Sequence, residues 1–138
     1  MSFKAIRPDE FEWITRPNQP GEPARHVAEL SDAVGSTHVR GNVWRPEPGA
    51  VGRRHRHPIQ EETFVVLSGE LSIYLGEPPE RVDMPAGGVV NVPAGTPLQS
   101  ANHGDVDLVV YAYGYPPEHA TAELLEPAGR RAEGQVVR

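Results

Sequence analysis

The chain has 138 residues and a formal net charge of −6 at pH 7, from 13 basic and 19 acidic side chains. This length suits one domain with a modest core. The acidic balance gives no support to nucleic-acid binding. Because the chain has no cysteine, disulfides and thiolate ligands are excluded. No apolar run reaches membrane-spanning length and no secretory signal opens the chain, so we expect a cytoplasmic protein with no membrane partner.

Fifteen prolines and fourteen glycines predict many turns and no long helices. The β-prone runs between these turns are short and regularly spaced, which indicates an all-β antiparallel sandwich or barrel. In chain order, we expect strands at 11–15, 24–31, 37–45, 61–67, 70–75, 81–84, 89–92, 98–101 and 106–115. A short helix over 118–126 and a mobile, charged tail over 127–138 complete the chain.

Four of these segments leave alternatives open. Residues 24–31 fit a strand or a helical turn, and a strand is favoured because a turn follows. In the strand at 37–45, alternate residues lie on opposite faces, and their types do not indicate which face points inward. Tyr111, Tyr113 and Tyr115 share one strand face and form either a pocket lining or a packed aromatic stripe. Trp13 in the polar arm over 1–23 either packs in the core, which is favoured, or contacts a partner chain.

Two histidines and an acid stand out between Gly49 and Gly69. His55 and His57 are separated by one residue, so on an extended strand their side chains point the same way. Glu62, delivered by the next strand, can meet them from the side. Two imidazoles and a carboxylate suit a divalent transition metal such as Fe, Mn, Ni or Zn.

Arginines surround this pair in the sequence. Arg53, Arg54 and Arg56 interleave with the histidines, which makes a phosphate or nucleic-acid patch conceivable. The stronger interpretation is that they face outward or lie on the loop. Arg56 should point away from both histidines by strand parity.

The spacing of this stretch resembles the first motif of the cupin superfamily at every position. The matching residues are Gly49, His55, His57, Glu62 and Gly69. The second cupin motif follows from Gly87, with Pro93, Gly95 and Asn102 in the expected places. One position departs from it, because Leu98 stands where that motif normally has histidine.

The resemblance implies a single cupin domain over 1–138, a double-stranded β-helix or jelly-roll barrel with its core at about 24–116. In metal-binding members, His55, His57, Glu62 and the residue at the Leu98 position would be the four ligands. Members of the family commonly form homodimers through exchanged edge strands, and the N-terminal arm with Phe11 and Trp13 is our candidate for that contact.

No neighbour of Leu98 replaces the missing histidine cleanly. Gln99 and His103 fall on the opposite parity, and His103 lies in a turn. His38, on an earlier strand, is the best substitute. Glu61 is an alternative acid, although the spacing to the following glycine selects Glu62.

Two functions follow from these residues. The first is a small metal-dependent enzyme, a dioxygenase or isomerase by family resemblance, acting on a small oxygen-bearing molecule. The second is a metal-free module that binds or senses a small molecule, in which the histidines and Glu62 satisfy one another. Gly49, Gly69, Gly87 and Gly95, and also Pro93 and Asn102, are interpreted as structural residues.

Overall fold

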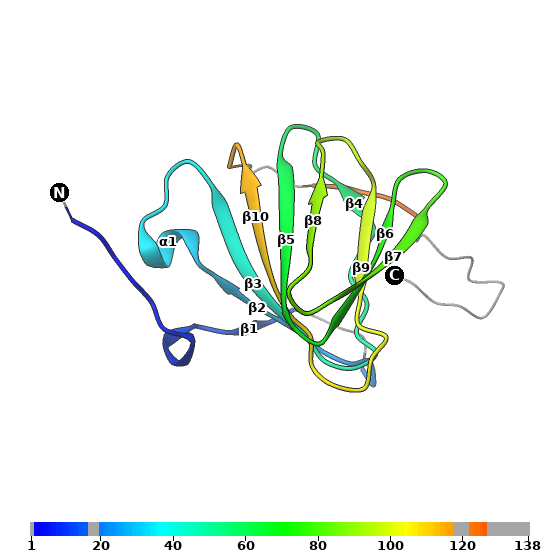
Figure 1. The fold of residues 1–138 in the computed structure, drawn as a ribbon, viewed down its shortest axis with the longest axis horizontal. Helices are drawn as coiled ribbons and strands as arrows, with labels where there is room; N and C mark the ends of the chain where they lie inside the picture. Colours follow the sequence, from blue (N-terminus) through cyan, green and yellow to red (C-terminus); the bar gives the residue numbers. More distant parts are fainter. Residues whose placement is uncertain (1, 17–19, 118–121, 127–138) are drawn as a thin grey trace.

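The computed structural model describes residues 2–16, 20–117 and 122–126, and two antiparallel sheets pack face to face within them (Figure 1). The predicted all-β antiparallel architecture is therefore confirmed. None of the helices in the described ranges is long and apolar enough to cross a membrane.

The first sheet has six strands in the order β1-β2-β3-β10-β5-β8. Their bounds are β1 (Ile14–Thr15), β2 (Arg25–Glu29), β3 (Arg40–Pro46), β10 (Val109–Tyr115), β5 (Glu61–Ser68) and β8 (Val89–Val92). A 3₁₀ turn, η1 (Pro8–Glu10), precedes β1, and one helical turn, α1 (Ser31–Val34), separates β2 from β3. The strand expected at 24–31 thus ends at Glu29, because the chain must turn into β3.

The second sheet has five strands in the order β11-β4-β9-β6-β7. Their bounds are β11 (Glu123–Leu124), β4 (His55–Arg56), β9 (Leu98–Ala101), β6 (Glu70–Leu75) and β7 (Glu80–Pro85). The β5–β6 hairpin joins the two sheets through Gly69, whose φ is 78°. A Cβ at Gly69 would lie 2.7 Å from the Asp107 carbonyl oxygen, so only glycine fits this connection.

The main core lies between the sheets. Its buried members are Phe64, Val66, Leu71, Ile73, Val90, Val92, Leu98, Leu108, Val110 and Ala112. A smaller cluster on the outer face of the six-stranded sheet packs Val43 and Ala28 against Trp13 of the N-terminal arm. Both faces of β3 are therefore covered, with Trp44 packed against the inner core and Val43 beneath the arm.

Asn102 holds the end of β9 in place, as its structural interpretation requires. It is buried, and its Nδ2 donates to the carbonyl oxygens of Pro46 and Val106 at 3.0 and 2.8 Å. Its Oδ1 accepts a hydrogen bond from the Gly104 amide at 3.0 Å. The side chain thus satisfies backbone groups in the turn that follows β9.

The C-terminal helix predicted over 118–126 is wrong where the chain is described. Glu123 and Leu124 form β11, which pairs antiparallel with Arg56 and His55 of β4. The exposed edge of β4 offers unpaired backbone groups, and an extended segment satisfies them where a helix cannot. Residues 118–121 and the predicted mobile tail over 127–138 lie outside the described residues.

Candidate metal centre

The candidate site is built where the two sheets face each other. His55 comes from β4 of the five-stranded sheet and His57 follows two residues later, whereas Glu62 comes from β5 of the six-stranded sheet. One potential ligand atom from each of the three side chains lies within 4.8 Å of the others. The residues that the sequence selected are therefore brought together.

The hydrogen bonding of His55 defines which of its ring nitrogens carries the proton and which faces the site with a lone pair. Its Nδ1 lies 2.8 Å from the Arg53 carbonyl oxygen. A carbonyl can only accept, so Nδ1 carries the proton and donates. In the neutral ring, this leaves a lone pair on Nε2, the arrangement that second-shell hydrogen bonds give to metal-binding histidines.

Burial lowers the pKa of His55 below its ordinary value, and the hydrogen bond to Arg53 opposes this shift. The positive charges of His57 and Arg25 lower the pKa further, while Glu62 raises it. The His55 and His57 rings meet edge to face, with centroids 4.9 Å apart. The neutral form of His55, which is the form that binds metals, is favoured by this environment.

Glu62 faces His57, but the distance between their nearest polar atoms is too long for a strong hydrogen bond. His57 Nε2 and Glu62 Oε1 are 3.4 Å apart, and these side chains keep only 16% and 13% of their accessible surface. Charge-assisted N–H···O bonds are normally about 2.7–2.9 Å long. Glu62 Oε1 is buried, and no hydrogen bond from a described residue reaches it. A cation between the three side chains would satisfy this oxygen, so the donor set fits a divalent metal.

Leu98 forms an apolar wall beside the histidine pair. It pairs with His55 across β4 and β9, is 2% exposed and belongs to the main core. The position that the resemblance reserves for a fourth ligand is thus filled by a packed hydrocarbon side chain. It faces the same interior that His55 faces, because directly paired residues share a sheet face.

The other candidates lie elsewhere. His38 is exposed and contacts Thr37 through its Nδ1, and it is not part of the ligand cluster. Gln99 turns to the opposite face of β9, where its Nε2 donates to the Gly52 carbonyl at 2.9 Å. His103 lies 3.1 Å from the Tyr74 hydroxyl, outside the cluster. Glu61 lines a different pocket, on the outer face of the sheet.

The arginines near the histidines divide between surface and interior. Arg56 forms an ion pair with Glu123 of β11, and Arg53 is exposed. Arg54, by contrast, is only 7% exposed and donates to Glu77 at 3.0 Å and to two carbonyl groups. It ties the β6–β7 turn to the C-terminal segment, a structural role that the sequence interpretation missed.

One further charged side chain, which acts on His55, was not singled out from the sequence. Arg25 of β2 is half-buried, and its guanidinium carbon lies 5.7 Å from the centroid of the Trp44 ring. Its charge is among those that lower the pKa of His55. The available signal was an arginine two residues from Val27 in a predicted strand, hence on the same face as a core residue.

A search of known protein families matches the cupin domain to residues 42–113, which include both histidines and Glu62. The chain belongs to the cupin superfamily. The family predicted from the two motifs is therefore confirmed, including the segment that contains Leu98. No curated protein matched this cupin.

Solved structures support the same fold. A sugar phosphate isomerase of the cupin superfamily from Silicibacter pomeroyi is 26% identical, with a TM-score of 0.68, over 81% of this chain and 75% of that chain. A predicted oxalate decarboxylase from Thermotoga maritima is 22% identical, with a TM-score of 0.71, over 82% and 99%. The Bacillus subtilis oxalate decarboxylase, which has Mn(II) centres, is 22% identical, with a TM-score of 0.64, over 79% and 29%. At 22% identity, the last two show the fold alone.

The environment of His55 predicts how the metal-free protein responds to acid. Because its folded-state pKa is lowered, the unfolded chain takes up a proton first as the pH falls below about 6.5. The free energy of unfolding should therefore decrease from that pH down to the folded-state pKa and then become insensitive to this group. Urea titrations of the chelator-treated protein at several pH values test this. The decrease should be smaller in His55→Gln, and parallel pH profiles for the two proteins would contradict the assignment.

Proposed function

We propose that this cupin holds a divalent transition metal through His55, His57 and Glu62 and uses it as an enzyme on a small oxygen-bearing molecule. The observation that carries the proposal is the buried Glu62 oxygen without a hydrogen bond beside two convergent imidazoles. An unsatisfied buried acceptor costs about 1–3 kcal/mol, more when charged. A metal ion would remove this cost.

The donor set narrows the metal to a class. Two imidazoles and one carboxylate are typical of sites for Fe(II), Mn(II), Ni(II) or Zn(II), with the remaining positions left to water or substrate. The Mn(II) centres of the Bacillus subtilis oxalate decarboxylase support this class by analogy of fold. The set contains no thiolate, in agreement with the absence of cysteine.

A bound metal would act as a Lewis acid that polarises an oxygen atom of the substrate. His55 and His57 orient the site from one sheet, and Glu62 supplies the negative charge from the other. Leu98 excludes water on its side, while the partial exposure of His57 and Glu62 leaves a path from solvent. Of the two reaction classes, isomerisation is favoured by the likeness to the sugar phosphate isomerase.

Metal analysis of the protein purified without chelator tests the proposal. The wild type should contain roughly one transition-metal ion per chain. The double variant His55→Ala, His57→Ala should lose it, because two of the three donors are gone. His103→Ala, which removes an imidazole outside the cluster, should keep it. A folded wild type without metal, after Fe(II), Mn(II), Ni(II) and Zn(II) have each been offered, would instead favour a metal-free binding or sensor module.

Restoring the missing imidazole should strengthen the site. Leu98 faces the interior opposite His55, so Leu98→His places a fourth donor near the other three. We expect Zn(II) to bind at least about tenfold more tightly, a gain of about 1.4 kcal/mol. Competition with a chromophoric chelator measures this change. Val106→His, at a loop side chain that is 59% exposed, is the control, and equal affinities in both variants would count against the placement of residue 98.

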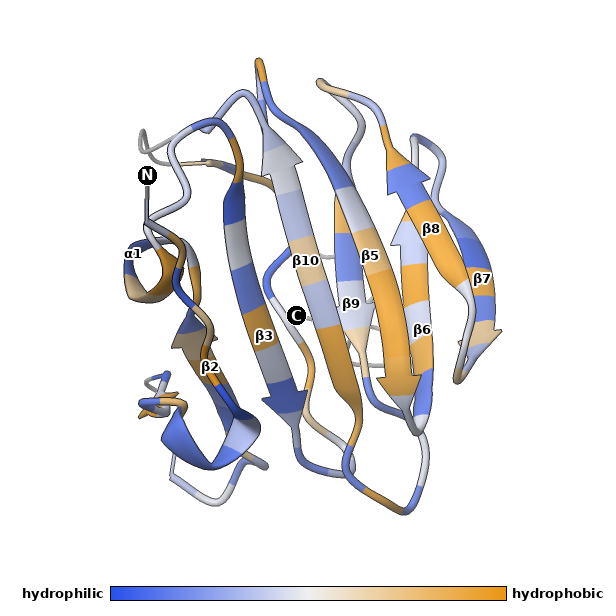
Figure 2. Cartoon of the chain, turned by 60° about the vertical axis from the view of Figure 1, so that its left-hand side comes forward, coloured by the Kyte–Doolittle hydropathy of each residue, from blue (hydrophilic) through white to orange (hydrophobic). Residues whose placement is uncertain are grey.

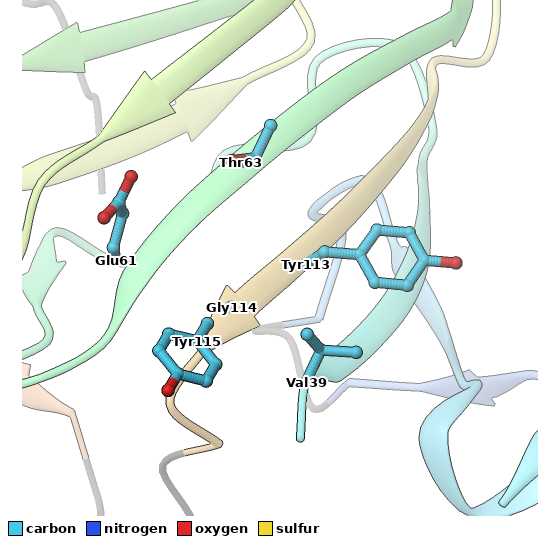
Figure 3. A pocket seen from close by; sticks show the side chains of 6 residues that line it. All are labelled: Val39, Glu61, Thr63, Tyr113, Gly114 and Tyr115. Atoms are coloured by element: carbon cyan, nitrogen blue, oxygen red, sulfur yellow. The ribbon is translucent and has the colours of Figure 1, made fainter. Parts of the chain in front are cut away.

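We also propose that the cupin forms a homodimer through the outer face of the six-stranded sheet. β10, β5 and β8 lie side by side in front of the second sheet (Figure 2). Leu67 and Val89 on this face are 56% and 57% exposed. Tyr113 and Tyr115 lie nearby around a surface pocket (Figure 3). Exposed apolar side chains gathered on one face are typical of interfaces.

Sedimentation equilibrium tests the homodimer. The wild type should sediment with twice the mass of one chain, and the double variant Leu67→Glu, Val89→Glu should sediment as a monomer because buried charges destabilise an interface. Val106→Glu changes a side chain that is 59% exposed in a loop and should leave the dimer intact. A monomeric wild type would rule the homodimer out.

A further inference from the structure

Arg25 is a charged residue on the inner face of the six-stranded sheet. Two residues along the same strand face, Val27 is 5% exposed and pairs with Trp44 of β3. The Arg25 guanidinium lies over the Trp44 ring, 5.7 Å from its centroid. Its Nε is buried, and no hydrogen bond to a described residue satisfies it. A buried donor of this kind carries a cost that a bound acceptor would remove.

The surroundings of Arg25 are cationic, although the whole chain carries a net charge of −6. Arg16 lies over the same Trp44 ring at 5.9 Å. Burial lowers the pKa of Arg25, the charges of Arg16 and Arg53 lower it further, and Glu22 opposes them. The charges that act on Arg25 are thus those of two further guanidinium groups and one carboxylate, a balance that favours an anion beside it.

Arg25 also lies close to the segment that precedes the histidine pair. A Cβ placed on Gly52, three residues before His55, would lie 3.7 Å from Arg25 Nη1 and 3.0 Å from Ser100 Oγ. The close Ser100 backbone already accounts for a glycine at position 52. The contact places the guanidinium next to the segment that leads into β4, and its charge reaches the His55 ring. The cation therefore acts on one of the candidate metal ligands.

We propose that Arg25, which lies over Trp44, forms the anion-binding end of the His55–His57–Glu62 site and holds the carboxylate of a small organic acid. A guanidinium is planar and presents parallel N–H donors that match the two oxygens of a carboxylate. The unsatisfied Nε supplies one of these donors. This assignment rests on the proposed function in one respect only, namely the group that the other end of the acid contacts.

The competing interpretation is that Arg25 only covers Trp44. Arginine packs on aromatic faces without any ligand, and such a contact stabilises the fold modestly. The two interpretations differ in one measurable respect. A packing role needs no anion, whereas a carboxylate subsite must bind a small acid and must lose that binding when the guanidinium is removed.

The two tryptophans of the chain provide the readout. Trp44 lies beneath Arg25 on the inner face, whereas Trp13 packs on the outer face beneath Arg45, 5.0 Å from its ring centroid. Glycolate, a small hydroxy acid, is titrated into ¹⁵N-labelled protein, both metal-free and Zn(II)-loaded, while the two indole N–H signals are followed. Trp13→Phe assigns the signals. We expect a saturable shift of Trp44 and none of Trp13, and no saturable shift with the neutral amide glycolamide.

Variants separate charge recognition from packing. Arg25→Met should weaken glycolate binding about ten- to hundredfold, as expected for loss of a charge-assisted hydrogen bond. Arg25→Lys keeps the charge without the fork and should bind with intermediate affinity. Arg45→Met removes the arginine over the other tryptophan and should bind like the wild type. Amide spectra that overlay on that of the wild type establish that each variant is folded.

The outcomes distinguish this inference from the proposed function. Arg25-dependent glycolate binding in a protein that takes up none of Fe(II), Mn(II), Ni(II) and Zn(II) would support the subsite and refute the metal enzyme. Zn(II) uptake together with glycolate binding that is equal in the wild type and Arg25→Met would refute the subsite alone. A wild type whose Trp44 signal does not respond to glycolate in either form would refute it as well.

Discussion

The candidate site depends on the packing of two sheets against one core. The two histidines belong to one sheet and Glu62 to the other, so the three side chains converge only while the sheets stay closed. Leu71 and Ile73, both with 0% exposure, fill the core between the two sheets and hold the sheets together. A slip of one residue in β5 would turn Glu62 outward. The chemistry of the site is therefore a consequence of strand register.

The sequence predicted the features that strand parity and turn geometry determine locally. Motif spacing selected Glu62, which the structure brings to the histidines, over Glu61, which lines another pocket, and parity turned Arg56 away from the histidines. It also placed Gln99 on the face opposite to Leu98. Side chains alternate strictly along a strand, so these predictions need only a strand assignment and one reference residue.

What the sequence could not predict depends on contacts between distant segments. The face of β3 stayed ambiguous because both faces are covered, one by the core and the other by the N-terminal arm. The predicted C-terminal helix was wrong because residues 123–124 pair with the edge of β4. Local helix propensity contains no information about this distant contact. Arg54 is buried because a turn and the C-terminal segment both supply acceptors to it. Burial of a charge is a tertiary property, and residue type argues against it.

Leu98 and Arg25 both make the site more favourable for an anionic ligand. Replacing an imidazole by leucine removes a neutral donor and leaves the charge of the ligand set unchanged, at a single negative charge from Glu62. A divalent ion held by this set would leave a site with a net positive charge and one protein donor fewer than the second motif normally supplies. Arg25 adds a further positive charge beside His55. Fewer protein donors and a larger positive field both favour an anionic oxygen ligand, so the departure at residue 98 is compatible with a working site.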